Sequence, residues 1–321
     1  GEAAGLSASV AWIAEGDQAS AEFGTSLSVA GDVNGDGYSD LIVGAYRYAR
    51  GQTDEGRAFV YHGSPAGLAA ADAWNAESNQ DSASFGYSLS AAGDVNGDGY
   101  GDVIIGAPYY DSGQTNEGQV FVFNGAATGL SSSPDWTAQS NQSSALFGYS
   151  VNTAGDVNGD GYSDVVVGCP FWTQFTSSTE GKAFVYHGSA SGLSGSANWS
   201  YNAGEPYNQQ YASDVATAGV VNGDGYSDVI AGAYRFANGN TGEGKAFVYY
   251  GGGGAGNART TVQQYSPGSN SVVGSGGLTY YNGQVKLAIY GKSPFGMTKA
   301  KIHHEYKQNG NPFSGAVIRN G

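Results

Sequence analysis

Apolar residues in positions 1–251 fall into short runs, separated by turns rich in glycine and polar residues. Leu41–Tyr46 (LIVGAY) and Gly56–Gly63 (GRAFVYHG) are examples, and they carry the branched and aromatic side chains typical of strands. The apolar positions do not recur with the 3.6-residue period of an amphipathic helix. The pattern therefore predicts an all-β chain.

A ten-residue segment recurs along the chain at a nearly fixed spacing of 62, 62 and 64 residues. Its copies are Gly31–Asp40 (GDVNGDGYSD), Gly93–Asp102, Gly155–Asp164 and the altered Gly219–Asp228 (GVVNGDGYSD). Flanking residues keep the same register, namely the Phe-Gly pairs at Phe23, Phe85 and Phe147 and the tryptophans Trp12, Trp74, Trp136 and Trp199. Whole units repeat, and each unit contains four predicted strands.

Four-stranded units of this size cannot bury their apolar faces alone, and a β-propeller stacks such units as blades around an axis. We therefore expect residues 1–251 to form about four propeller blades, either alone or as part of a larger propeller. Charge changes at the end of this region, because residues 1–251 carry 27 acids and 6 bases whereas residues 252–321 carry 1 acid and 7 bases. Two domains are predicted.

The C-terminal segment, residues 252–321, also has a strand pattern. Gln284–Tyr290 and Lys299–Tyr306 alternate as strands do, and Asn282-Gly283 is a typical hairpin turn. We expect a small β-sandwich-like domain or a fragment of one.

The repeated loops have the pattern DxNxDGxxD. Positions 1, 3, 5 and 9 supply side-chain oxygens, position 7 can supply a backbone carbonyl, and the glycine at position 6 permits a sharp turn. Three carboxylates and an amide so close together favour a hard cation, whereas zinc would prefer nitrogen or sulfur. An EF-hand would need an acidic residue at position 12, where Val43 and Ile105 stand. The alternative is a polar β-turn without metal.

Calcium is the cation that this pattern predicts, with three strong Ca2+ sites and a fourth that is weak or empty because Val220 replaces the first aspartate. The predicted ligands are Asp32, Asn34, Asp36, Tyr38 and Asp40; Asp94, Asn96, Asp98, Tyr100 and Asp102; Asp156, Asn158, Asp160, Tyr162 and Asp164; and Asn222, Asp224, Tyr226 and Asp228.

The Phe-Gly pairs, the calcium loops and Gly106-Ala107-Pro108 together resemble the FG-GAP repeats of integrin α-subunit propellers, over about residues 5–251. The resemblance implies a calcium-binding propeller, normally of seven blades. The sequence departs from that pattern at Gly44 and Gly232 (Gly-Ala-Tyr), at Gly168 (Gly-Cys-Pro) and at Tyr211-Ala212. Four repeats are fewer than seven, so we expect a fragment of a longer propeller. The alternative is a four-bladed ring in which the Trp12 strand completes the last blade.

The loops after the Gly-Ala-Pro positions should emerge on the face opposite the calcium loops, because successive strands of a blade run antiparallel. Aromatic and arginine side chains there suit glycan stacking or a protein contact, and the alternative is packing between blades. The predicted ligand-binding residues are Tyr46, Arg47, Tyr48, Tyr109, Tyr110, Phe171, Trp172, Phe175, Arg235 and Phe236.

Composition limits the function further. The net charge of −15 argues against nucleic acid or an anionic membrane as partner, and no apolar run is long enough to insert into a membrane. Cys169 is the single cysteine, and no catalytic constellation is recognisable, so an enzyme is not expected.

We expect an extracellular module, secreted or on the cell surface, that uses calcium in adhesion or recognition of a protein or glycan ligand. Other subunits or further propeller blades are possible partners. The alternatives are a structural subunit of a surface layer or filament, and a non-catalytic part of a polysaccharide- or lipid-degrading enzyme, since FG-GAP propellers also occur in such enzymes.

Overall fold

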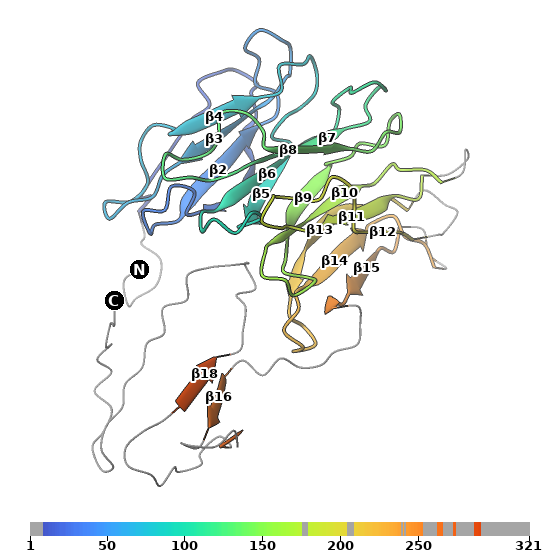
Figure 1. Cartoon of the computed structure of the whole chain (residues 1–321). Helices are drawn as coiled ribbons and strands as arrows, with labels where there is room; N and C mark the ends of the chain where they lie inside the picture. The colour runs from blue at the N-terminus through green and yellow to red at the C-terminus, as the bar shows by residue number, and fades with distance from the viewer. Residues whose placement is uncertain are drawn as a thin grey trace.

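The computed structural model describes residues 9–174, 179–203, 209–238, 240 and 242–252, together with three short strands beyond residue 261. Every element in this part of the chain is a β-strand, so none of it forms a helix that could cross a membrane (Figure 1). The prediction of an all-β chain is confirmed.

Three four-stranded antiparallel sheets and one three-stranded sheet follow one another along the chain, and we call them blades 1 to 4 (Figure 1). Blade 1 contains β1 (Phe23–Gly31), β2 (Asp40–Ala45), β3 (Arg57–Tyr61) and β4 (Trp74–Glu77). Blade 2 contains β5 (Ser88–Gly93), β6 (Asp102–Ala107), β7 (Gln119–Phe123) and β8 (Trp136–Gln139). Blade 3 contains β9 (Ser150–Gly155), β10 (Asp164–Cys169), β11 (Lys182–Tyr186) and β12 (Trp199–Asn202). Blade 4 contains β13 (Tyr211–Gly219), β14 (Asp228–Ala233) and β15 (Lys245–Tyr249).

A separate sheet has the order β17-β16-β18, with β16 (Val262–Tyr265), β17 (Val272–Val273) and β18 (Lys286–Ile289). The predicted strand Gln284–Tyr290 contains β18, whereas Lys299–Tyr306 and the Asn282-Gly283 turn lie outside the described residues. The division at residue 251 and the β-sandwich stay predictions.

The blades form an open series. The first strands β1, β5, β9 and β13 pack against one another in that order, whereas β1 and β13 share no extensive contact. On β1, Leu27 is 72% exposed, whereas Leu89 and Val151, at the corresponding place in the next two blades, are 7% and 4% exposed. Val29 of β1 is also exposed, at 51%. The described blades therefore do not close the four-bladed ring considered as an alternative.

Buried apolar residues gather between neighbouring blades rather than within one sheet. Ile42 and Val60 of blade 1 share a core with Phe85 and Val103 of blade 2, and similar cores lie between blades 2 and 3 and between blades 3 and 4. Each blade thus depends on its neighbour for burial, as expected for stacked repeats.

The register tryptophans connect each blade to the next. Their rings contact the ring at the end of the following blade's third strand at a centroid distance of 4.9 Å in all four pairs: Trp12–Tyr61, Trp74–Phe123, Trp136–Tyr186 and Trp199–Tyr249. The indole Nε1 of Trp74 also donates to the Ser131 carbonyl at 2.9 Å, and that of Trp136 donates to the Ser194 carbonyl at 3.0 Å. These tryptophans therefore have a structural function.

Glycine is required where two blades approach most closely. A Cβ at Gly106 of β6 would overlap the Gly148 carbonyl of blade 3 and the Ser88 hydroxyl, which itself donates to that carbonyl at 2.7 Å. Gly195, in contrast, lies in open space.

We predict that Gly106→Ala lowers the free energy of unfolding by about 2 kcal/mol, because the extra methyl group forces the two blades apart. Gly195→Ala is the matched control and should stay within about 0.5 kcal/mol of the original protein. Denaturant titration in calcium measures both. Equal effects of the two substitutions would contradict this account of the blade contact.

Candidate functional site

The repeated loops between the first and second strand of each blade are hydrogen-bonded to one another. The Gly101 N–H donates to the Asp32 carbonyl at 2.8 Å, and the Ser163 and Ser227 N–H groups donate to the Asp94 and Asp156 carbonyls, each at 2.9 Å. Because every loop contacts the next one, the loops line a single face of the blade series.

In the second, third and fourth loops the tyrosine at position 7 packs onto the preceding loop. Tyr100 covers Gly35 so closely that a Cβ there would overlap the ring, and Tyr162 and Tyr226 cover Gly97 and Gly159 in the same way. The ring therefore packs between blades, and the candidate metal ligand at this position is the backbone carbonyl, as the sequence predicted.

Positions 1, 3 and 5 of the loop converge. In the first loop the Asp36 N–H lies 3.0 Å from both Asp32 Oδ1 and Asn34 Oδ1, and Asn34 Nδ2 lies 3.1 Å from Asp36 Oδ2. The second loop repeats the arrangement, with the Asp98 N–H 3.1 Å from Asp94 Oδ1 and 3.0 Å from Asn96 Oδ1. In both loops the position-1 and position-3 side-chain oxygens thus meet at the backbone N–H of position 5, whose own carboxylate lies beside the position-3 amide.

The third loop has the same geometry. The Asp160 N–H lies 3.0 Å from Asp156 Oδ1 and 2.9 Å from Asn158 Oδ1, and Asp156 Oδ2 accepts the Gly161 N–H at 2.9 Å. The three intact sequence copies are therefore also three equivalent structures.

The aspartate at loop position 9 has different contacts from the side chains at positions 1, 3 and 5. Asp40 is completely buried, and its carboxylate accepts the Val33 N–H at 2.9 Å and the Gly63 N–H at 2.8 Å. Asp102, Asp164 and Asp228 bind the corresponding pairs of N–H groups in the other blades. This aspartate ties the loop to the end of the third strand, and each oxygen retains a second lone pair.

Burial makes the carboxyl groups of Asp40, Asp102 and Asp164 weaker acids than usual, because it raises their pKa values. Loss of hydration raises the pKa of Asp102 to about 8 and that of Asp164 to about 7, although the backbone N–H groups act in the opposite direction. Burial also raises the pKa of Asp94, and the charge of Asp98 adds to that effect. A cation placed among these groups would favour their ionised forms.

The fourth loop keeps only part of this arrangement. The Asp224 N–H still lies 3.1 Å from Asn222 Oδ1, and Asp224 Oδ1 accepts the Tyr226 N–H at 2.9 Å. Val220 cannot supply the carboxylate that accepts two loop N–H groups in the first copy and three in the second and third. The position-1 oxygen ligand is therefore missing from this loop.

The donor set fits a hard divalent cation. In the part of the chain that the structure describes, no three His, Cys, Asp or Glu side chains converge on one point. Each of the first three loops combines the carboxylates of positions 1 and 5 with one asparagine amide, while the position-9 carboxylate faces the backbone. An all-oxygen set of this kind suits calcium better than zinc.

Aromatic side chains form a row across the other ends of the blades. Tyr87, just before β5, lies between Tyr46 and Tyr149, with centroid distances of 5.4 and 5.0 Å, and Tyr149 lies 6.4 Å from Phe171. Tyr109 is 36% exposed. Burial raises the pKa of Tyr87, and its hydrogen bond with Tyr149 adds to this. We call these five residues the aromatic row.

The other predicted ligand-binding aromatics pack back onto their own blades. Tyr48 contacts Phe59 and Tyr110 contacts Phe121, at centroid distances of 5.8 and 5.7 Å. Two further rings lie against lysines, with Lys182 Nζ 4.5 Å from the Trp172 ring and Lys245 Nζ 4.4 Å from the Phe236 ring. The structure thus separates the predicted set into an outer row and an inner packing layer.

Three predicted residues remain. Arg47 is exposed and lies 3.8 Å from the Glu22 carboxylate, and Arg235 lies over the ring of Tyr234 at 5.6 Å. Phe175 lies outside the described residues. Arg47 also lies over the ring of Tyr46, a member of the aromatic row, at 5.4 Å.

Sequence reasoning missed two groups of residues. Tyr87 and Tyr149 follow the Phe-Gly pairs directly, and this repeated position was the available signal. Glu55 and Glu117 are almost fully buried, and Glu117 Oε1 accepts the Ser112 N–H at 2.8 Å. The repeated Glu-Gly pair therefore shapes the loop that carries the aromatic row.

Comparison with known proteins agrees with this geometry. Residues 23–61, 85–123 and 147–186 match the FG-GAP repeat. The chain is 37% identical over 161 residues to human integrin alpha-IIb, covering 48% of this chain and 15% of the relative.

Two other relatives give the same result. Integrin alpha-5 of Xenopus laevis is 35% identical over 185 residues, covering 55% of this chain and 17% of the relative. Integrin alpha-PS2 of Drosophila melanogaster is 35% identical over 169 residues, covering 48% and 12%. The chain thus spans less than a fifth of the length of these curated relatives. Blades 1 to 3 are FG-GAP repeats, and the chain is similar to the propeller of integrin α subunits.

Proposed function

We propose that this chain is an extracellular recognition or adhesion module that binds calcium on one face and a protein or glycan ligand on the other. The observation that carries the proposal is the separation of two kinds of chemistry within one set of blades. Oxygen-lined loops occupy one end of each blade, and the aromatic row occupies the opposite end. Similarity to integrin α subunits supports the adhesive function.

Calcium would have a structural effect in this proposal. Ions held by the first three loops would offset the repulsion between carboxylates and tighten the contacts that link one loop to the next. Sites of this kind are filled at extracellular calcium concentrations and empty in the cytosol, which supports placement at the cell surface or in secretion. The proposed function is binding and requires no catalytic residue.

The aromatic row supplies the recognition surface. Half-exposed tyrosine and phenylalanine rings with a neighbouring arginine provide flat apolar area and hydrogen-bonding groups at low entropic cost. Tyr46, Tyr87, Tyr149 and Phe171 already contact one another in edge-to-face or tilted pairs, so binding would cost little conformational entropy.

We predict three calcium ions per chain, two in Asp98→Ala and four in Val220→Asp. Asp98 is an exposed position-5 ligand, whereas Val220→Asp restores the missing position-1 carboxylate. Isothermal titration measures the stoichiometry, with Asp17→Ala as a control of equal charge outside the loops. A dissociation constant near 0.1 mM in 2 mM calcium would add about 1.8 kcal/mol of stability per site. Unchanged stoichiometry in both loop variants would contradict the assignment.

We predict that calcium affinity rises between pH 6 and pH 8.5. At pH 6 the raised pKa values mean that metal-free Asp102 and Asp164 hold protons, which a cation must displace. Without calcium the folded state becomes less stable as pH rises through about 7 to 8. The reason is that the buried carboxyls must then ionise, whereas those of the unfolded chain are already ionised. Thermal unfolding in calcium and in chelator across this range measures both, and parallel curves would argue against the coupling.

We predict that Tyr109→Ala lowers ligand affinity at least about tenfold, whereas Tyr38→Ala changes it less than about twofold. Tyr109 belongs to the aromatic row, and Tyr38 is similarly exposed, at 41% against 36%, on the calcium face. Labelled protein is first tested on an array of glycans and matrix proteins in calcium, and the captured compounds are then titrated. Equal losses in the two variants would show that the aromatic row is not the binding surface.

A further inference from the structure

All four repeated loops contain an asparagine followed by a glycine, at positions 3 and 4. The pairs are Asn34-Gly35, Asn96-Gly97, Asn158-Gly159 and Asn222-Gly223. Asparagine before glycine is prone to lose its side-chain amide, because glycine leaves its own backbone nitrogen unhindered for attack on the asparagine Cγ. Each pair lies in the same local sequence, Val-Asn-Gly-Asp-Gly-Tyr, so the four have equal intrinsic reactivity. Any difference between the loops must therefore come from the fold.

The position-1 aspartate restrains this glycine nitrogen in the second and third loops. The Gly97 N–H donates to Asp94 Oδ1 at 2.6 Å. The Gly159 N–H donates to Asp156 Oδ1 at the same distance of 2.6 Å. Hydrogen bonds to a charged acceptor are among the stronger ones, and this bond must break before the nitrogen can attack. Attack should therefore be slow in both loops.

The first loop restrains its glycine less directly. Asp32 accepts the Asp36 and Gly37 N–H groups, at 3.0 and 2.8 Å, rather than that of Gly35. The Tyr100 ring covers Gly35 closely and limits its movement. We expect a reactivity above that of the second and third loops.

The fourth loop has no carboxylate at position 1. Val220 stands there, and the Gly223 N–H lies 3.4 Å from the Val220 backbone carbonyl. This contact is longer than the 2.6 Å bonds of the second and third loops, and its acceptor is uncharged, so it restrains the nitrogen less. The difference depends on residue 220 of the loop itself and not on what lies beside blade 4.

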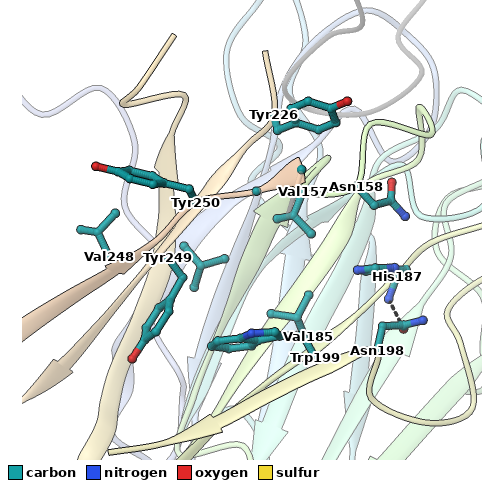
Figure 2. Close-up of a pocket in the computed structure, with 13 residues that line it drawn as sticks. Val157, Asn158, Val185, His187, Asn198, Trp199, Tyr226, Val248, Tyr249 and Tyr250 are labelled. Atoms are coloured by element: carbon teal, nitrogen blue, oxygen red, sulfur yellow. Dashed lines mark hydrogen bonds between the residues drawn. The ribbon is translucent and has the colours of Figure 1, made fainter. Parts of the chain in front are cut away.

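The contacts of the asparagine side chain are the same in the third and fourth loops, which are neighbours. Figure 2 shows Asn158 of the third loop and Tyr226 of the fourth at the border of one cavity of about 690 Å³ between blades 3 and 4. Asn158 Oδ1 accepts the Asp160 N–H at 2.9 Å, and Asn158 Nδ2 donates to Asp160 Oδ2 at 2.8 Å. Asn222 makes the same two contacts with Asp224, at 3.1 and 2.8 Å. The residue at position 1 is therefore the difference that matters.

We propose that Asn222 is a site of spontaneous deamidation and that it reacts before the asparagines of the other three loops. The Gly223 nitrogen forms a bond to Asn222 Cγ while the Cγ–Nδ2 bond breaks, and the proton lost from the nitrogen leaves with the ammonia. Water then opens the five-membered imide. Cleavage of the new N–Cγ bond gives aspartate, and cleavage of the original peptide bond gives isoaspartate. The net reaction consumes water and releases ammonia, without oxidation or reduction.

The product changes the charge of the fourth loop. In the aspartate product a carboxylate oxygen replaces the Asn222 Nδ2 group that donates to Asp224 Oδ2. Two negative groups then lie where an amide met a carboxylate, and they repel each other. The modified loop should be less stable. Calcium should offset the repulsion, an expectation that rests on the proposed function.

The test follows the purified full chain in chelator by peptide mapping and tandem mass spectrometry, which locates each replacement of NH2 by OH. In the folded protein Asn222 should react at least about tenfold faster than Asn96 and Asn158, with Asn34 between them. In denaturant all four should react at the same rate, because their local sequences are identical. Asn222 reacting no faster than Asn96 in the folded protein would overturn the proposal.

Asn124 provides an internal control within the same digest. The N–H of the following Gly125 donates to the buried Asp102 at 2.9 Å, so this Asn-Gly pair should also react slowly.

Two variants isolate the role of position 1. Val220→Asp restores the carboxylate and should slow Asn222 to the rate of Asn96. Val221→Asp is the matched control, because it adds the same charge one position later at a side chain that is 56% exposed, and Asn222 should still react fast. Equal slowing in the two variants would contradict the assignment to the position-1 contact.

A second series in calcium tests the metal sites separately. Calcium should slow Asn34, Asn96 and Asn158 further, because their amide oxygens would be ligands, and should change Asn222 little. The series in chelator tests the modification site alone, so failure of one proposal can be distinguished from failure of the other. Asn222→Asp carries the product charge, and it should unfold at a lower temperature than the original chain in chelator and gain more from calcium. An unchanged unfolding temperature would overturn the effect predicted for the product.

Discussion

A buried aspartate at the start of each second strand is the contact on which the rest of the blade depends. Asp40, Asp102, Asp164 and Asp228 are completely buried, and each accepts one N–H from its own loop and one from the end of the third strand. Three segments of the blade therefore meet at one carboxylate. Because a buried carboxyl group without hydrogen-bond partners would be strongly unfavourable, this contact fixes where the loop and the third strand can lie.

The fixed loop has consequences on both faces. It brings the position-1, -3 and -5 oxygens together, and it places the tyrosine ring of one blade on the glycine of the previous one. At the other end of the same strands, the loops that follow Gly-Ala-Pro bring Tyr46 and Tyr109 toward Tyr87 and Tyr149. The repeated loops and the aromatic row thus lie at opposite ends of the same strands, repeated in register.

Much of the blade structure could be predicted from the sequence because the same residue pattern recurs in every blade. Periodic apolar runs gave the strands, and the fixed position of Trp74 and Trp136 marked the fourth strand of each blade. The division of the aromatic residues was beyond sequence reasoning, since Tyr46 and Tyr48 differ only in which side of the loop they occupy. Their separate contacts, with Tyr87 and with Phe59, depend on the neighbouring blade and the third strand.

The role of position 9 was also only partly predictable. The spacing of the loop indicated an oxygen ligand at Asp40. It did not show that the Val33 N–H would donate to one oxygen of this carboxylate and the Gly63 N–H to the other, because Gly63 is distant in sequence. The same limit applies to Glu117, which looks like an ordinary surface acid until the fold buries it.

Amide hydrogen exchange at Gly63, Gly125, Gly188 and Gly251, compared in calcium and in chelator, tests the central claim most directly. Each of these N–H groups donates to a position-9 aspartate. The account predicts slow exchange at all four in chelator and further slowing by calcium at the first three, because the fourth loop lacks its first carboxylate. Fast exchange at these amides, or an equal response of Gly251 to calcium, would contradict it.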